Sequence, residues 1–441
     1  MTSNTRVVVI GAGLAGVRLA RRLGELGTAV TLIGDEEHRP YNRVLLAEVL
    51  AGRYSPEVIA LPAPADLVRA RVTGIDRAKR TVECADGTKI AYDTLVLATG
   101  SNPVLPPLRG LFANAYLAPA HRAGGPTRSS GRGSGGRPPG RHSTPDHVLP
   151  DGVHAFRTMD DCLGLSEAVR PGVRAVVIGG GLLGVSAARA LALRGAQVVL
   201  AQQSERLMER QLDPGASKLV RRHLTDLGVE IHTHLRVRDV RCVGGTVRSV
   251  EMADGYAMDA DLVVLACGVH PRVGLAQVAG LDVRKGIVVD DELRTSDPHI
   301  RALGDCAQHD GTVYGLATPA LEQADVLAEL LASEAGAAGD PAARYTGTRS
   351  LTRLTLAGEG FFDLAAFGET EALPGDDVVQ LADATRGTYR KVVVRDDRLV
   401  GGVLVGELGT VGALARAWEG AEPLPADGAP LLHLLTNDGG S

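Results

Sequence analysis

Cysteine is scarce and scattered in this chain of 441 residues. Its five cysteines are Cys84, Cys162, Cys242, Cys267 and Cys306. Their number is odd and no two of them are spaced as C-x-x-C, so the sequence indicates neither a disulfide framework nor a zinc or iron–sulfur cage. No cysteine precedes Cys84, which leaves the N-terminal segment without a thiolate that could attack or be reduced. These absences decide against dithiol chemistry.

Long apolar runs and a strong net charge are also lacking. No apolar run approaches the ~18 residues that a membrane-spanning helix needs, and no charged-apolar-small leader precedes the first apolar strand. We therefore expect a cytoplasmic protein that does not bind membranes. The net charge of −5 gives no general reason to expect nucleic-acid binding, and 44% hydrophobic residues fit a globular protein of two to four domains with a sizeable core.

The N-terminal stretch RVVVIGAGLAGVRLARRLGELGTAVTLIGDE is typical of a unit that binds a dinucleotide. Its apolar pattern predicts a buried parallel strand over residues 7–10, a helix over 17–26 and a second strand over 29–33. The second strand ends on the acids Asp35 and Glu36. An acid at this place can accept hydrogen bonds from a ribose, so both are candidate cofactor-binding residues.

Three glycines follow the first strand in the pattern G-x-G-x-x-G. Gly11 allows a tight turn, Gly13 lets the backbone approach a pyrophosphate, and Gly16 lets helix and strand pack closely. The pyrophosphate then lies at the N-terminus of a helix, which carries roughly half a positive charge. The pattern is weak evidence alone, but here the strand, the helix and the acids accompany it.

The same pattern recurs in RAVVIGGGLLG, as Gly179, Gly181 and Gly184. The first glycines of the two patterns are 168 residues apart (179 − 11), and so are Asp261 and Asp93 (261 − 93). Each aspartate begins a segment D-x-apolar-apolar-apolar-A-x-G-x-x-P. Two similar dinucleotide-binding domains are therefore predicted, each ending in a small-residue turn where a backbone can approach a cofactor.

Two such domains in one chain suggest two dinucleotides. The economical pairing is one flavin and one nicotinamide, because a hydride can pass directly between two rings held in contact. The protein then supplies mainly position and electrostatics. No side-chain nucleophile or general base is required, and we assign no catalytic residue.

The composition changes abruptly over residues 121–147. This stretch has seven glycines, four prolines, five arginines and no aromatic residue. Such a segment cannot bury enough apolar surface to offset its ordering entropy, so it is predicted to be a disordered insertion. Its arginines could contact an acidic partner, although a solvated linker is the simpler interpretation.

The part that follows the second glycine pattern predicts further elements. A strand is expected over residues 286–290, a turn at Gly304-Asp305 that can present a carboxylate to a sugar alcohol, and a helix over 319–331. The N-terminus of that helix could stabilise negative charge on a reduced flavin. The neighbouring Cys306 and His309 are interpreted as structural residues.

The last hundred or so residues alternate in the manner of strands, over 351–356, 389–394 and 399–405. They predict a small α+β domain. This domain has no cysteine, so it cannot ligate an iron–sulfur cluster through thiolates.

Five longer motifs carry a resemblance to a known family. They are PYNRVLLAEVLAG (40–52), AFRTMDD (155–161), ERLMERQLD (205–213), TSDPHIRALGDCAQHDGTVYGLATPALEQA (295–324) and YRKVVVRDDRLVGGVLVGEL (389–408). Through them the chain resembles the NADH-and-FAD portion of bacterial assimilatory nitrite reductase large subunits and the electron-transfer subunits of assimilatory nitrate reductase. Rubredoxin and ferredoxin reductases are more distant relatives.

The resemblance implies an α/β fold with two three-layer Rossmann-like dinucleotide-binding domains and a small C-terminal α+β domain. The implied domains are FAD-binding (1–117 and 272–335), an insertion (118–150), NAD(P)H-binding (151–271) and C-terminal (341–441). FAD would be bound by Gly11, Gly13, Gly16, Asp35, Glu36, Arg43, Thr99, Gly100, Asp305, Thr318 and Pro319. NAD(P)H would be bound by Gly179, Gly181, Gly184, Gln202 and Gly268.

The chain departs from the family pattern at three places. Ser186 stands where relatives often carry glutamate, and Glu48 where many carry lysine, so the flavin potential and the hydride-transfer rate are open. Gln202 stands where a ribose-binding acid is expected, with Arg206 nearby. A neutral residue there neither favours a 2′-hydroxyl strongly nor repels a 2′-phosphate. NADH is favoured by the resemblance alone.

The function that the sequence favours is an FAD-dependent NAD(P)H oxidoreductase. It would pass electrons to a separate iron–sulfur, molybdenum or sirohaem partner in nitrate or nitrite assimilation, because the cysteine-rich parts of complete nitrite reductases have no counterpart here. One alternative is a rubredoxin or ferredoxin reductase of another pathway. A second is a slow-turnover flavin redox sensor, motivated by Ser186, Glu48 and Gln202. The oligomeric state stays open.

Overall fold

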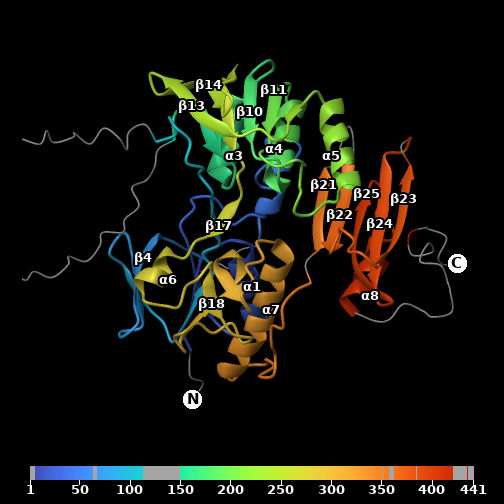
Figure 1. The fold of residues 1–441 in the computed structure, drawn as a ribbon. Helices are drawn as coiled ribbons and strands as arrows, with labels where there is room; N and C mark the ends of the chain where they lie inside the picture. Colours follow the sequence, from blue (N-terminus) through green and yellow to red (C-terminus); the bar gives the residue numbers. More distant parts are fainter. Residues whose placement is uncertain are drawn as a thin grey trace, which may run out of the picture.

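The computed structural model describes residues 5–62, 67–112, 149–349, 351–356, 362–383, 385–420 and residue 435. Figure 1 shows their arrangement as three packed parts of the chain. Nearly all of the predicted insertion, residues 118–148, lies outside the described residues, so the expected disorder there stays a prediction.

A five-stranded parallel sheet with the order β19-β7-β1-β2-β3 forms the first part. Its strands are β1 (Val7–Ile10), β2 (Val30–Gly34), β3 (Leu67–Arg69), β7 (Thr94–Leu97) and β19 (Ile300–Ala302). Two helices that pack against each other, α1 (Leu14–Glu25) and α7 (Ala317–Glu334), share one apolar core with this sheet. A small antiparallel sheet joins that core through β4 (Val72–Asp76), β5 (Thr81–Cys84) and β6 (Lys89–Ala91). The neighbouring strands β1 and β7 are almost wholly apolar and buried, as expected for a parallel sheet that is covered on both faces.

The second part repeats this arrangement with the strand order β12-β11-β10-β16-β9. Its parallel strands are β9 (Val153–Ala155), β10 (Arg174–Ile178), β11 (Gln197–Ala201), β12 (Glu230–His232) and β16 (Leu262–Leu265). Its helices are α3 (Met159–Ala168), α4 (Leu182–Leu193) and α5 (Pro214–Asp226). Its antiparallel sheet is β13 (Val237–Val243), β14 (Thr246–Met252) and β15 (Ala257–Asp259). The two dinucleotide-binding folds predicted from the repeat are confirmed.

The two repeats differ in the origin of one edge strand. Beside β7 lies β19, which comes from the chain after the second repeat, whereas beside β16 lies β9, which comes from the chain before it. The chain therefore leaves the first part, completes the second and then returns to complete the first. Two short pairs accompany this path: β8 (Ser101–Pro103) with β17 (Val269–Pro271), and β18 (Ile287–Val289) with β20 (Ala307–His309).

The third part is an antiparallel sheet with the order β21-β22-β25-β24-β23 and one helix. Its elements are β21 (Leu351–Leu356), β22 (Phe362–Gly368), β23 (Asp377–Asp383), β24 (Thr388–Arg395), β25 (Arg398–Val405) and α8 (Val411–Gly420). These elements confirm the predicted α+β domain. One face of the sheet packs with α8, and the other packs towards α4 and α5 (Figure 1).

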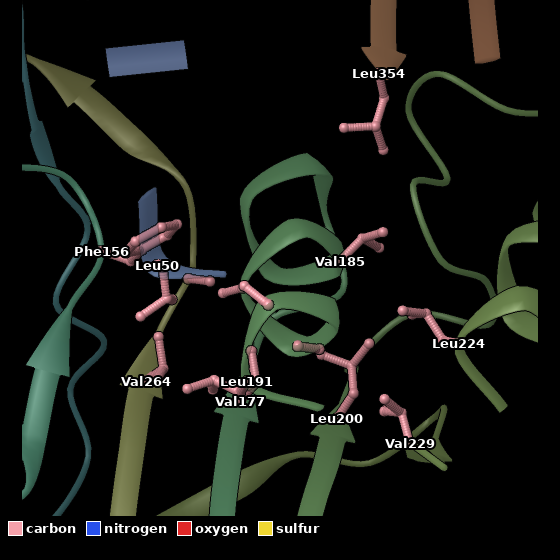
Figure 2. Packing of buried hydrophobic residues seen from close by; sticks show 14 of the residues in the cluster. Leu50, Phe156, Val177, Val185, Leu191, Leu200, Leu224, Val229, Val264 and Leu354 are labelled. Atoms are coloured by element: carbon pink, nitrogen blue, oxygen red, sulfur yellow. The ribbon is translucent and has the colours of Figure 1, made fainter. Parts of the chain in front are cut away.

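A single apolar core joins all three parts around α4. In Figure 2, Leu50 of the first part lies on one side of α4 and Val185 of α4 lies on the other, with Leu354 of the C-terminal sheet above the helix. Leu50 ends the short helix α2 (Leu46–Leu50), which follows the 3-10 turn η1 (Arg43–Leu45). Because this core is shared, the two dinucleotide-binding folds are held in a fixed relation rather than joined only by linkers.

Candidate functional site

The first glycine turn has the close contacts that its pattern predicts. Gly11 has φ +116°, and a Cβ built on it would lie 2.1 Å from the carbonyl oxygen of Ala98 at the end of β7. A Cβ on Gly16 would lie 2.0 Å from the oxygen of Gly11. By contrast, no atom lies within 4 Å of a Cβ on Gly13. Gly11 and Gly16 are therefore required for packing, whereas the space over Gly13 is free for a ligand.

The second glycine turn repeats these contacts at matched positions. A Cβ on Gly179 would lie 2.4 Å from the Ala266 oxygen, and one on Gly184 would lie 1.7 Å from the Gly179 oxygen. Nothing lies within 4 Å of a Cβ on Gly181. The structure thus forms the same cradle twice.

Both cradles fit a pyrophosphate. Gly13 and Gly181 are the N-caps of α1 and α4, and neither helix start has a side-chain cap. In α3 and α5, by contrast, Thr158 and Asp213 cap the first turn. The free backbone N–H groups at α1 and α4, together with the helix dipole, make these two ends suitable for an anion.

The acids at the end of β2 lie beside a hollow of about 520 Å³ that is lined by Asp35, Glu36, Glu37, Arg69, Ala70 and Arg71. Glu36 accepts a hydrogen bond from the Tyr41 hydroxyl at 2.6 Å and one from Arg43 at 2.9 Å. Burial raises the pKa of Tyr41, so this hydroxyl stays a donor. The hollow suits the adenosine end of a dinucleotide, and Arg43 acts there by holding Glu36.

Asp305 lies in a partly buried polar cluster with two residues that sequence reasoning missed as site residues. Its Oδ2 accepts hydrogen bonds from the Ser101 hydroxyl at 2.7 Å and from Arg157 at 2.7 Å. Arg157 is 15% exposed, burial lowers the pKa of its guanidinium, and its Nε is buried without a hydrogen-bond partner. The signal for Arg157 was its place in the motif AFRTMDD, and Ser101 follows the Thr99-Gly100 turn directly.

The other residues that the sequence predicts to bind FAD lie near the first glycine turn. A Cβ on Gly304 would lie 3.3 Å from Ala15 Cβ in the first turn of α1 and 3.8 Å from Ala320 Cβ in α7. The Gly304-Asp305 turn, in η3 (Gly304–Cys306), therefore lies between the starts of these two helices. Thr318, which is exposed, and Pro319, which is buried, belong to the first turn of α7.

A two-stranded ribbon connects the small-residue turns of the two repeats. Strand β8 starts after Gly100 and β17 starts after Gly268, and they pair antiparallel. The Gly268 oxygen accepts a hydrogen bond from Val104 N–H, and the Gly100 oxygen accepts one from Arg272 N–H, each at 2.9 Å. Thr99 donates its hydroxyl to the Arg272 oxygen at 2.7 Å. The two turns are thus fixed at opposite ends of a ribbon roughly 13 Å long.

Gln202, at the end of β11, is bound within the protein. Its Oε1 accepts a hydrogen bond from Gly180 N–H at 2.7 Å, and its Nε2 donates to the Arg206 carbonyl at 3.3 Å. Of the other two departures, Ser186 is buried and donates its hydroxyl to the Leu182 carbonyl in the preceding turn of α4 at 2.8 Å. The Ser186 hydroxyl is therefore hydrogen-bonded within its own helix.

Glu48 forms a buried ion pair across the two repeats. Its carboxylate in α2 lies 3.8 Å from Arg189 Nη1 in α4, and these side chains are 8% and 2% exposed. Arg53 lies 3.4 Å away on the surface side. Charges of both signs therefore meet where the first and second parts pack together.

None of the five thiols is set up as a nucleophile. Burial raises the pKa of each, to about 11 for Cys162 and Cys267, so thiolate is scarce at neutral pH.

His309 pairs with Asp291 at 2.8 Å and packs edge-on against Tyr345. Within the described residues there is no group of three His, Cys, Asp or Glu side chains that could hold a metal ion. In those residues no helix combines the length and hydropathy of a membrane span.

Two similar cradles joined by a ribbon define a two-domain architecture that suits one flavin and one nicotinamide dinucleotide. A family model described as pyridine nucleotide-disulphide oxidoreductase matches residues 5–324, and a second, rubredoxin NAD+ reductase C-terminal domain, matches residues 353–419. The chain belongs to the pyridine nucleotide-disulphide oxidoreductase family, and the FAD and NAD(P)H dependence predicted from the sequence is confirmed for this class.

Individual relatives agree with this assignment. The chain is 31% identical over 415 residues to the assimilatory nitrate reductase electron transfer subunit of Bacillus subtilis, covering 91% of this chain and 48% of that one. It is 32% identical over 439 residues to the nitrite reductase [NAD(P)H] large subunit of Klebsiella oxytoca, covering 95% and 40%. The chain thus spans about half the length of these curated relatives or less. A solved structure of the covalent putidaredoxin reductase–putidaredoxin complex matches with a TM-score of 0.78 and 25% identity over 98% of both chains.

Proposed function

We propose that the chain takes a hydride from NAD(P)H onto FAD and passes the electrons to a separate redox protein in nitrate or nitrite assimilation. FAD would occupy the first cradle, with Gly11, Gly13 and Gly16 at its pyrophosphate, Asp35 and Glu36 at its adenosine ribose, and Thr99, Gly100, Asp305, Thr318 and Pro319 along its flavin half. NAD(P)H would occupy the second cradle at Gly179, Gly181 and Gly184, with Gln202 and Gly268 beside it.

The observation that carries this proposal is the ribbon of β8 and β17. It pairs the strand that follows Gly100 with the strand that follows Gly268, so the two turns are held roughly 13 Å apart and the rings of two extended dinucleotides would meet between them. A flavin accepts two electrons together and can release them singly, which is the chemistry that such convergence serves. The chain's own residues would bind and orient the two rings, because proximity supplies most of the required catalysis.

The partner is proposed from the names of the relatives. An iron–sulfur, molybdenum or sirohaem component would accept the electrons, since two of the relatives are nitrate and nitrite reductase proteins. A second candidate is a reductase for rubredoxin or a ferredoxin. It is favoured by the match to a rubredoxin reductase C-terminal domain and by the putidaredoxin reductase structure, which the chain matches over nearly its whole length.

An anaerobic titration tests the reductase proposal. The purified flavoprotein would be titrated with NADH and separately with NADPH while the visible flavin absorbance is followed, and then reoxidised with ferricyanide. Bleaching by one nucleotide followed by rapid reoxidation is expected. A bound flavin that neither nucleotide reduces would contradict the proposal. Slow bleaching would instead favour the redox sensor, for which Ser186, Glu48 and Gln202 are the motivation.

A further inference from the structure

The end of β11 is the place in this fold where the adenosine ribose of a nicotinamide dinucleotide is recognised. The chain has no carboxylate at this position, and the carboxamide of Gln202 is bound to Gly180 and to the Arg206 carbonyl. Gln202 therefore contributes little to a choice between a ribose hydroxyl and a 2′-phosphate. If the chain distinguishes NADH from NADPH, another group must provide the selectivity.

Arg206 is fixed close to the second cradle by backbone contacts. Its carbonyl accepts the Gln202 amide, and Met208 N–H donates to the Gly180 carbonyl at 2.8 Å. A Cβ on Gly180 would lie 2.6 Å from Leu207 Cδ2, so the turn that carries Arg206 packs directly on the glycine turn. The Arg206 side chain is 22% exposed, and its Nε is buried without a hydrogen-bond partner. A guanidinium so placed is suited to a phosphate.

The charge of Arg206 is compensated by the C-terminal domain. Arg206 Nη2 donates to Glu371 Oε1 at 2.8 Å, and Glu371 is 61% exposed in the segment that follows β22. The two residues are separated by 165 positions in the chain. A carboxylate beside Arg206 offsets its attraction for an anion and repels a second negative group.

A buried network holds this segment in place. Lys391 Nζ in β24 donates to the Thr370 carbonyl at 2.9 Å and to Asp213 Oδ2 at 3.0 Å. The same carboxylate oxygen accepts the Tyr389 hydroxyl at 2.6 Å, while Asp213 Oδ1 caps α5. Lys391 and Asp213 are 11% and 4% exposed. The residue just before Glu371 is therefore anchored to the second part of the chain by a buried lysine rather than by a surface contact.

We propose that Glu371 is a specificity-determining residue of the nicotinamide-dinucleotide site, which selects NADH over NADPH by neutralising Arg206. The C-terminal domain thereby completes a site that lies in the second dinucleotide-binding fold. This inference rests on the proposed function, in that NAD(P)H must bind the second cradle. Because the pair is partly exposed, the discrimination it provides is on the order of tenfold, the effect of one charge-assisted hydrogen bond.

Steady-state kinetics of the FAD-loaded protein with ferricyanide as acceptor test the inference. The readout is the ratio of kcat/KM for NADPH to kcat/KM for NADH. In Glu371→Gln this ratio should rise roughly tenfold, and the rise should shrink at high salt because the site is exposed. The matched control is Glu369→Gln, which removes the same charge two residues away, where Glu369 pairs with Arg395 at 2.8 Å. That control should leave the ratio unchanged.

A double variant shows whether the effect passes through Arg206. In Arg206→Gln/Glu371→Gln the ratio should fall back towards that of Arg206→Gln alone, because the released cation is gone. An unchanged ratio in Glu371→Gln, with NADH still bleaching the flavin, would overturn this inference and leave the proposed function intact. A flavin that neither nucleotide reduces would overturn both. Competitive inhibition by adenosine 2′,5′-bisphosphate gives a second readout and should tighten in Glu371→Gln to a similar degree.

Discussion

Arg157 and Asp305 are joined by a 2.7 Å hydrogen bond although 148 positions separate them in the chain. Arg157 lies between β9 and α3 of the second repeat, where its backbone N–H donates to Asp161 and its carbonyl accepts from Arg43. Asp305 belongs to the returning segment of the first repeat. The start of the second fold therefore contributes Arg157 to the polar cluster beside the first cradle, which couples the proposed flavin site to the placement of the second fold.

The first prediction concerns Asp305 and the binding of FAD. In Asp305→Asn the side chain keeps its shape and one acceptor oxygen but loses its charge, so its hydrogen bond to a ribityl hydroxyl should weaken. The expected loss is roughly tenfold in FAD affinity, from about 1.5 kcal/mol for a charged hydrogen bond. Titration of the apoprotein with FAD, followed by quenching of flavin fluorescence, measures it.

The control for Asp305 is Asp325→Asn. Asp325 forms an ion pair of the same kind, at 2.7 Å with Arg18, but this pair joins α1 to α7 and its side chains are 38% and 31% exposed. FAD affinity should be unaffected in this variant. If Asp305→Asn bound FAD as tightly as the unmodified protein, the placement of Asp305 at the cofactor would be wrong.

Local pattern was sufficient to predict most of the framework. The strand 7–10 coincides with β1, the strand 351–356 coincides with β21, and the spacing of Gly11 and Gly179 predicted the repeated fold. The reason is that these elements are set by apolar runs and by glycines that no other residue can replace. Boundaries shifted where a helix began earlier than its apolar face, as in α7, which starts at Ala317 rather than Pro319.

Contacts between distant segments could not be predicted in this way. Arg157, Ser101 and Glu371 carry no spacing that marks them, because each meets its partner only after the chain has crossed between domains. The pairing of Glu48 with Arg189 could not be predicted either, because Arg189 lies on another helix in the other repeat. Such pairs depend on tertiary packing rather than on periodicity.

The second prediction separates a glycine that serves packing from one that serves binding. Gly16→Ala would force a Cβ to within 2.0 Å of a backbone oxygen, whereas the space over Gly13 is free. We expect Gly16→Ala to destabilise the apoprotein by about 3 kcal/mol, from overpacking, and Gly13→Ala by at most about 1 kcal/mol. Gly13→Ala should nevertheless lose most of its FAD affinity, because the new methyl group occupies the cofactor's space. Urea unfolding and FAD titration of both apoproteins measure the contrast.

The exposed Gly24 of α1 provides the control for this pair. Nothing lies within 4 Å of its Cβ position either, but Gly24 is near the other end of the helix. Gly24→Ala should stabilise slightly, by about 0.5 kcal/mol from helix propensity, and should bind FAD normally. Normal FAD binding by Gly13→Ala would show that the free space over Gly13 is not the pyrophosphate site.

The third prediction concerns the buried pair of Glu48 and Arg189. Glu48→Ala leaves the Arg189 guanidinium buried at the junction of the two repeats without its carboxylate, so we expect a loss of about 3 kcal/mol in the free energy of unfolding. Asp226→Asn is the comparison, since its pair with Arg222 is 70% exposed on the aspartate side and contributes at most about 1 kcal/mol. Equal effects in the two variants would show that Glu48 is not a structural counter-charge.

The fourth prediction is a pH dependence shared by the two repeats. Arg6 pairs with Asp93 and Arg174 with Asp261, both at 2.8 Å, and these hydrogen bonds lower the pKa of each aspartate to about 2. A depressed pKa in the folded state means that the stabilisation is present above the unfolded pKa of about 3.9 and is lost as the pH falls towards 2. Each pair is exposed by more than a third, so its contribution is below about 1 kcal/mol.

The difference in unfolding free energy between the unmodified protein and Asp93→Asn, or Asp261→Asn, should therefore be constant from pH 5 to 7 and shrink between about pH 4 and 2. Urea unfolding across this range measures it, and a difference that grows as the pH falls would mean that these carboxylates are not stabilised by their arginines.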